Sequence, residues 1–156
     1  MIVVSDTSPI LNLDRIGRID LLPQLFGQVV VPTTVFQELS KLPNRSYAFP
    51  WLTITSAVNQ ELVTSLRMEL DPGESEAIVL AQELNADILL IDERRGRRVA
   101  SRYGLNFTGL LGILAQAKAR SLIPHVGPIL EELQTVANFW ISPGLKQEFL
   151  ELLGEM

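Results

Sequence analysis

Two aspartates of this 156-residue chain each come directly after a run of residues typical of a buried strand. Asp6 follows the run 2–5, and Asp92 follows the run 86–91, both of which are largely apolar. In an open parallel sheet, such residues project from the carboxyl edge, where ligands bind. A single aspartate of this kind is an ordinary turn residue. Two of them on neighbouring strands indicate a functional edge of the sheet.

Three glutamates are further candidates for the same site. Glu74 and Glu76 lie in the first turn of a predicted helix, where the helix dipole favours negative charge. Glu76 also falls within the apolar stripe of that helix, so at least one of the two should point inward. A buried carboxylate needs a partner, and a metal ion is one that suffices. Glu38, taken alone, has the character of a solvated helical residue.

Arginines gather beside Asp92, although the net charge of −5 argues against a protein that coats nucleic acid non-specifically. They are Arg94, Arg95, Arg97, Arg98 and Arg102. Mg²⁺ and Mn²⁺ prefer carboxylate and water oxygens, and two such ions can support cleavage of a phosphodiester. A metal site next to arginines therefore suits a nuclease. The same run could form a solvated helix face, but directly after Asp92 we favour contact of its first four arginines with a phosphate backbone.

Other residue types add little chemistry. Thr7 and Ser8 flank Asp6 and could bind a metal-bound water or a phosphate, or simply cap the following helix. The chain has no cysteine, which excludes disulfides, thiolate metal sites and cysteine nucleophiles. Its one histidine, His125, suits a surface or packing position better than that of a general base. No signal peptide and no apolar stretch of about 20 residues is present, so we expect a cytoplasmic protein without membrane contact.

Strands and helices are predicted to alternate along one domain spanning residues 1–156. The predicted strands are 2–5, 28–31, 51–55, 86–91 and 106–108. The predicted helices are 33–40, 74–84, 97–103, 110–120, 127–136 and 144–153, with amphipathic helices within 10–26. Residues 42–50, 71–73 and 92–96 are predicted loops or turns. This alternation predicts an α/β fold, a three-layer α/β/α sandwich around a mostly parallel sheet.

Four segments in order resemble the PIN-domain family, in particular the small VapC-like ribonucleases of prokaryotic toxin–antitoxin pairs. They are VSDTSPI (4–10), VPTTVFQEL (31–39), GESEAI (73–78) and LLIDE (89–93). The tail segments 109–123 and 139–142 are similar to a branch whose third acidic motif is Gly-Glu-x-Glu-Ala. The likeness covers nearly the whole chain.

This resemblance implies a sheet between helices and Mg²⁺- or Mn²⁺-dependent cleavage of RNA. It implies catalytic roles for Asp6, Glu38, Glu74 and Asp92, metal ligation by these four and by Glu76, and RNA binding by Arg94, Arg95, Arg97 and Arg98. Glu38 becomes a candidate by resemblance alone. The chain departs from the common family form in having two glutamates at the third acidic position, and Leu90 where a threonine is usual. Because flap endonucleases use a similar Glu-x-Glu pair for metals, both glutamates are kept.

The leading hypothesis is an endoribonuclease, the toxin of a toxin–antitoxin pair. The alternative is a catalytically inactive module of the same fold that binds nucleic acid or protein. Aspartyl-phosphate transfer with Asp6 as nucleophile ranks last, because Ser8 stands where such enzymes have a second aspartate. The family implies an antitoxin protein that inserts a segment into the acidic groove, and the amphipathic helices in 10–26 would support a homodimer.

Overall fold

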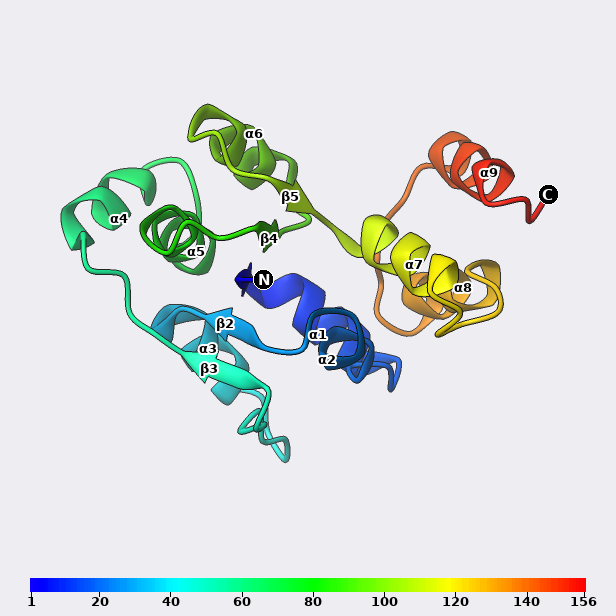
Figure 1. The fold of residues 1–156 in the computed structure, drawn as a ribbon, viewed down its shortest axis with the longest axis horizontal. Helices are drawn as coiled ribbons and strands as arrows, with labels where there is room; N and C mark the ends of the chain where they lie inside the picture. The colour runs from blue at the N-terminus through cyan, green and yellow to red at the C-terminus, as the bar shows by residue number, and fades with distance from the viewer.

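A five-stranded parallel sheet forms the centre of the computed structural model, which describes residues 1–156 (Figure 1). The strands are β1 (Val3–Ser5), β2 (Val29–Val31), β3 (Leu52–Ile54), β4 (Ile88–Leu90) and β5 (Phe107–Thr108), in the order β3-β2-β1-β4-β5. β1 is central and pairs with both β2 and β4, and Ser5 lies opposite Leu90. The predicted strands are confirmed in shorter form, and Asp6 and Asp92 do follow neighbouring strands.

Both faces of the sheet are buried. Val3 of β1 packs in one hydrophobic core, while Val4 packs in the other, because successive side chains of a strand point to opposite faces. In β4, Leu89 and Leu90 are divided in the same way. A sheet covered on both sides needs continuous apolar strands, which is the pattern that the sequence shows.

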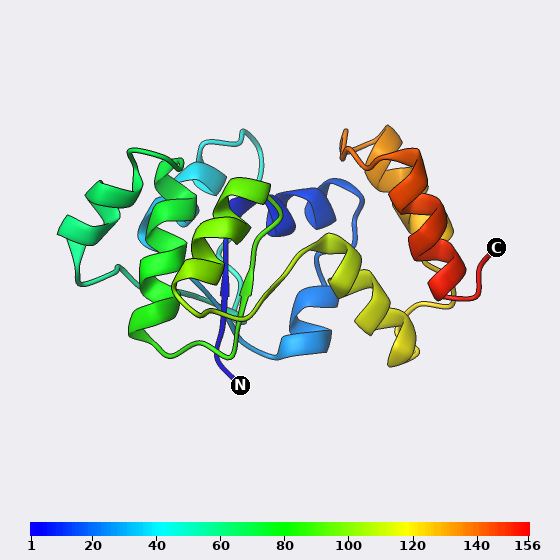
Figure 2. The same cartoon turned by 90° about the horizontal axis from the view of Figure 1, so that it is seen from above.

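The chain has nine helices, most of which cover the two faces of the sheet, while the last two lie at one end of the molecule (Figure 2). They are α1 (Thr7–Arg15), α2 (Leu21–Phe26), α3 (Thr33–Ser40), α4 (Gln60–Leu66), α5 (Pro72–Glu83), α6 (Arg94–Arg102), α7 (Leu110–Ala119), α8 (Gly127–Thr135) and α9 (Pro143–Leu152). The buried residues of α4, α5 and α6 share the core of Val4, and those of the other helices share the core of Val3. The three-layer α/β/α sandwich is therefore confirmed.

Helices α5 and α6 begin two and three residues earlier than predicted. α5 starts at Pro72, because Asp71 is its N-cap and proline is well suited to the first helical turn. α6 starts at Arg94, with Glu93 as its N-cap residue, so the predicted loop 92–96 is wrong after its second residue. Gly96 does not interrupt α6, because arginine is a good helix former and the position is buried. Helix α4 was not predicted.

The apolar residues of α1 and α2 face the interior. Ile10 and Leu13 of α1, and Leu22 of α2, are fully buried in the core. The homodimer expected from these helices therefore loses its supporting observation and stays a prediction. None of the helices is long and apolar enough to cross a lipid bilayer.

Candidate metal centre

Asp6 occupies the carboxyl end of the central strand. Its N–H donates to the Leu90 carbonyl at 2.9 Å, so the backbone continues the ladder while the residue starts α1 as N-cap. The residue is only 4% exposed. Burial raises the pKa of Asp6 well above its usual value, and the charges of Asp71, Glu74 and Glu38 raise it further, against a lowering by the Thr7 N–H. Asp6 therefore lies among carboxylates from α3 and the start of α5.

Glu74 joins this cluster from the first turn of α5. Its Oε1 accepts from the Asp71 N–H at 3.3 Å, and Asp71 Oδ1 accepts from the Glu74 N–H at 2.8 Å, which is a capping box. The other oxygen, Oε2, is buried and has no hydrogen-bond partner. Burial, followed by the interactions with Asp71, raises the pKa of Glu74 to about 7. Glu74 is thus the glutamate of the pair whose charge acts on Asp6.

Glu38 reaches the cluster from α3. Its Oε2 accepts a hydrogen bond of 2.5 Å from the Thr7 hydroxyl, which joins the first turn of α1 to α3. Asp6 is the N-cap residue of α1 and no side chain caps this helix, so the alternative that Thr7 or Ser8 simply caps it is wrong. Thr7 instead orients a candidate metal ligand, and Ser8 lines a neighbouring cleft.

Asp92 is held just beyond β4. Its Oδ1 accepts from the Leu110 N–H at 2.9 Å and lies 3.7 Å from Nη2 of Arg97. The second oxygen, Oδ2, is buried without a partner. Burial raises the pKa of Asp92, the Leu110 N–H and Arg97 lower it, and Glu93 raises it, with a net increase. Asp92 therefore offers a free buried oxygen, as Glu74 does.

Two glycines leave room for Glu74 and Asp92, and Gly73 does the same for Glu38. A Cβ on Gly96 would lie 2.8 Å from Glu74 Oε2 and 2.5 Å from Cδ1 of Ile91, and one on Gly109 would collide with Asp92 Oδ1 and the Arg97 guanidinium. Any larger residue at either position would displace an acidic side chain.

Glu76 has a different place from the one expected. Its Oε1 accepts from the N–H and the hydroxyl of Thr34 at 2.9 and 2.6 Å, and its Oε2 from the Ala57 N–H and Gln60 Nε2 at 3.0 and 3.3 Å. Burial alone would raise the pKa of Glu76, but these hydrogen bonds outweigh it and lower the pKa. Both oxygens are occupied by donors, so we correct its expected role as a metal ligand: Glu76 fastens the start of α3 and segment 57–60 to α5.

Arg97 also differs from expectation. Its Nε donates to the Ile91 carbonyl at 3.0 Å, and its guanidinium lies over the Phe107 ring, 5.9 Å from the centroid. Together with the contact to Asp92, these interactions orient the guanidinium, while 38% of the side chain stays exposed. Arg97 therefore positions Asp92, and its expected role in RNA binding stays a prediction.

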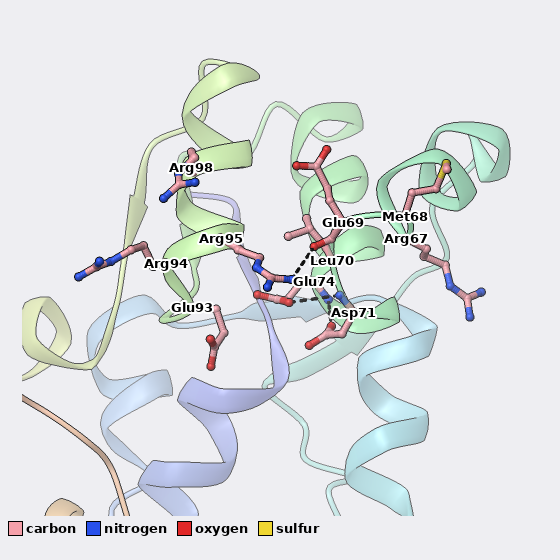
Figure 3. Close-up of a pocket in the computed structure, with 10 residues that line it drawn as sticks. All are labelled: Arg67, Met68, Glu69, Leu70, Asp71, Glu74, Glu93, Arg94, Arg95 and Arg98. Atoms are coloured by element: carbon pink, nitrogen blue, oxygen red, sulfur yellow. Dashed lines mark hydrogen bonds between the residues drawn. The ribbon is translucent and has the colours of Figure 1, made fainter.

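Three arginines of the run, Arg94, Arg95 and Arg98, line a cleft of about 750 Å³ beside the acidic cluster (Figure 3). We call it the arginine cleft; its lining includes Arg67, Arg94, Arg95, Arg98, Glu69, Asp71, Glu74 and Glu93. Figure 3 shows Arg95, Glu74 and Asp71 in the lining of this cleft, and Arg95 Nη1 donates to the Glu69 carbonyl at 3.5 Å. The cleft is thus lined by four arginines and four acidic residues, Glu74 among them.

Comparison with known families agrees with this geometry. A family model described as a PIN domain matches residues 2–155. The chain belongs to the PIN-domain family. Searches among curated proteins and among solved structures give no match. The resemblance drawn from the four acidic segments is confirmed at the level of the family, whose fold is of the nuclease type, while the VapC-like branch stays a prediction.

Sequence reasoning missed two residues of the PIN-domain site. Asp71 was noted only as part of a turn, yet it binds Glu74 and raises the pKa of Asp6. The spacing of Asp71 and Glu74 is that of a capping box, which could have revealed it. Arg67, at the end of α4, forms part of the arginine cleft and had no signal, because α4 itself was not recognised.

The acidic residues of this PIN domain are of the type that binds a divalent cation, but their side chains are not grouped around one point. No group of three or more carboxylate or imidazole side chains lies close enough to bind one metal ion. However, two buried carboxylate oxygens lack a partner, and burial and like charge raise the pKa of Asp6 and Glu74. A hard cation relieves both conditions and prefers such oxygens. Asp6, Glu38, Glu74 and Asp92 therefore remain the candidate ligands.

Proposed function

We propose that this PIN domain is an endoribonuclease that depends on Mg²⁺ or Mn²⁺. The observation that carries the proposal is the buried, unpartnered Oε2 of Glu74, next to Asp6 and at the edge of the arginine cleft. A buried carboxylate oxygen without a partner lowers the stability of the folded protein, because burying an unpaired charge is costly. Its environment is understandable if a cation and a phosphate group occupy the site.

In this proposal, Asp6, Glu74, Asp92 and Glu38 hold the cation. When bound, the metal supplies an activated water and stabilises the leaving oxygen of the phosphodiester. The protein contributes orientation: the Thr7 hydroxyl fixes Glu38, while the Leu110 N–H and Arg97 fix Asp92. The arginines of the neighbouring cleft bind the flanking phosphates, because guanidinium groups match phosphate geometry.

The direct test is cleavage of single-stranded RNA by purified protein in Mg²⁺, in Mn²⁺ and in EDTA. We expect metal-dependent cleavage by the wild type and a rate at least about 100-fold lower in Asp6→Asn. Asp20→Asn is the matched control, because Asp20 is exposed and lies beyond the far end of α1. Equal rates for all three proteins, or cleavage that persists in EDTA, would sink the enzyme proposal.

We further propose that the enzyme acts in the cytoplasm as the toxin of a toxin–antitoxin pair. The support is the similarity of the acidic segments to VapC-like ribonucleases. The expected partner is a small protein that inserts a segment into the acidic groove, and a homodimer is expected in solution. A short reading frame next to this gene, whose product co-purifies with the chain and stops cleavage, would support the pairing; no inhibition by that product would argue against it. Sedimentation of the isolated chain tests the homodimer.

The second candidate is a module of the same fold that binds RNA without cutting it. It is favoured by one observation, namely that no three acidic side chains are grouped closely enough to bind a metal. This candidate predicts RNA binding that is the same in EDTA and in Mn²⁺ and is unchanged in Asp6→Asn. Mn²⁺-dependent cleavage by the wild type would exclude it.

A further inference from the structure

A second cleft, of about 660 Å³, adjoins the arginine cleft. Glu93 and Arg94 line both clefts, and Asp92 lies in the wall of the second. The second cleft forms where the start of α6, the exposed side of α1 and the connection between α8 and α9 meet, and Figure 2 shows these elements in the fold. It therefore begins at the candidate metal centre and leads away from it.

Trp140 stands in this cleft with its side chain in solvent. It is 78% exposed, although it lies on a short connection whose neighbours Ala137 and Ile141 are buried. The Phe139 N–H also donates to the Leu133 carbonyl at 2.9 Å, which ties the connection to α8. The backbone on both sides is thus anchored, and the indole is held outward. A large aromatic side chain in such a position points to a binding role.

The groups around Trp140 are those that a nucleotide requires. Arg15 and Arg94 are both exposed, and neither forms an ion pair within the protein. Asn12 and Ser8 add amide and hydroxyl groups from α1. Only three of the lining residues are hydrophobic, so the cleft lacks the apolar surface that a protein partner or a membrane would favour. An aromatic face beside free cations is instead the usual platform for single-stranded nucleic acid.

We propose that Trp140 is a base-stacking subsite that takes one unpaired base of an RNA strand, while Arg15 and Arg94 contact its phosphates. A base in a duplex is already stacked and cannot reach an indole face, so the subsite selects single-stranded RNA. The subsite would define the substrate of the proposed ribonuclease, and its position next to the cleavage point rests on that proposed function. The binding event itself can be measured without cleavage.

The binding experiment uses Trp51→Phe, so that Trp140 is the only tryptophan of the chain. Trp51 stacks on Phe49, with 5.1 Å between ring centroids, and a phenylalanine preserves an aromatic contact there. In EDTA, a single-stranded RNA of about eight nucleotides should quench the Trp140 emission to saturation. A duplex of the same length should not. Quenching of equal strength by the duplex would overturn the proposal.

Affinity measurements with a labelled RNA then isolate the base. Trp140→Ala should weaken binding about 5- to 100-fold, whereas Trp140→Phe should keep most of it. One abasic nucleotide, moved along the strand, should cause a similar loss at a single position in the wild type and none in Trp140→Ala. Unchanged affinity of Trp140→Ala would refute the subsite. So would a dimer that forms without RNA and is lost in Trp140→Ala, since the indole would then contact a second copy.

The subsite and the ribonuclease can fail separately. A wild type that binds RNA through Trp140 but never cleaves it leaves the subsite standing and removes the enzyme proposal. Conversely, cleavage with the same KM in the wild type and in Trp140→Ala supports the ribonuclease and refutes the subsite. Asp6→Asn should retain Trp140-dependent binding in EDTA, and loss of that binding would count against the subsite.

Discussion

Replacing Glu74 and Glu76 by glutamine in turn should change stability in opposite directions, although the two residues lie in the same helical turn. Burial and the interactions with Asp71 raise the pKa of Glu74 from 4.5 to about 7. The folded protein therefore binds this proton more tightly than the unfolded chain does. Its contribution to stability is full below pH 4.5, decreases as the pH rises to about 7, and is constant above that.

The size of the effect follows from the linkage between pKa and stability. Each unit of pH between the two pKa values corresponds to about 1.4 kcal/mol. From about pH 5.5 to about pH 8, ionisation of Glu74 would remove roughly 2 kcal/mol from the free energy of unfolding. Glu74 borders an open cleft, and solvent screening reduces this to about 1–2 kcal/mol. Glu74→Gln avoids this loss, and its Oε1 can still accept from the Asp71 N–H.

Glu76→Gln is the matched comparison. Its amide nitrogen cannot accept the hydrogen bonds that one carboxylate oxygen now receives, so donors from Thr34 or Ala57 and Gln60 lose their partner. A buried donor without a partner costs about 1–3 kcal/mol. Because the pKa of Glu76 is lowered, this loss should be present at both pH values.

Urea unfolding in EDTA, followed by far-ultraviolet circular dichroism at about pH 5.5 and about pH 8, measures both variants. We expect the stability of Glu74→Gln relative to the wild type to increase by about 1–2 kcal/mol from the lower to the higher pH. Glu76→Gln should be less stable at both. If Glu74→Gln is destabilised at the higher pH to the same degree as Glu76→Gln, then Glu74 is not an unpartnered buried charge, and the argument for a cation at Asp6 and Glu74 fails.

Three further outcomes are expected. Mn²⁺ at about 100 times its Kd should raise the Tm of the wild type by roughly 5–10 °C, and should leave Asp6→Asn nearly unchanged, as measured by scanning calorimetry. Gly109→Ala should displace Asp92 and lower RNA cleavage by roughly 10- to 100-fold, and an unchanged rate would show that the Asp92 position is not critical. Hydrogen bonds from Lys118, Val126 and Gly127, acting against the effect of burial, lower the pKa of Glu155 to about 2. Glu155→Gln should therefore lower stability near neutral pH, and in urea titrations the difference from the wild type should vanish as the pH falls towards about 2.

The sheet and its functional edge could be predicted from the sequence, because strands buried on both faces leave unmistakable apolar runs. The residues that end two of these runs, Asp6 and Asp92, are then fixed at one edge by parallel topology alone. Register supplies the rest: Ser5 lies opposite Leu90, so both aspartates leave the sheet at nearly the same level.

The choice between Glu74 and Glu76 could not be made in this way. Two residues apart on a helix, they point to nearly opposite sides. In most helices the polar face would decide which side meets solvent. Here every residue from Gly73 to Ala81 is buried. This stretch of α5 therefore has no exposed face from which the direction of either glutamate could be predicted. Glu76 has a structural role only because α3 and segment 57–60 donate hydrogen bonds to it, and the positions of these segments depend on tertiary packing.

Gly96 and Gly109 have a consequence for sorting related chains. Acidic residues are easily exchanged between aspartate and glutamate, and a sequence can keep all of them while the site is no longer formed. A hydrogen at these two positions is harder to replace, because a Cβ would meet Glu74 in one case and Asp92 in the other. A relative with bulkier residues there would have to hold its carboxylates elsewhere, whatever acidic residues it retains. Glycine at positions 96 and 109 thus offers a criterion for separating relatives that keep this site from those that keep only the fold.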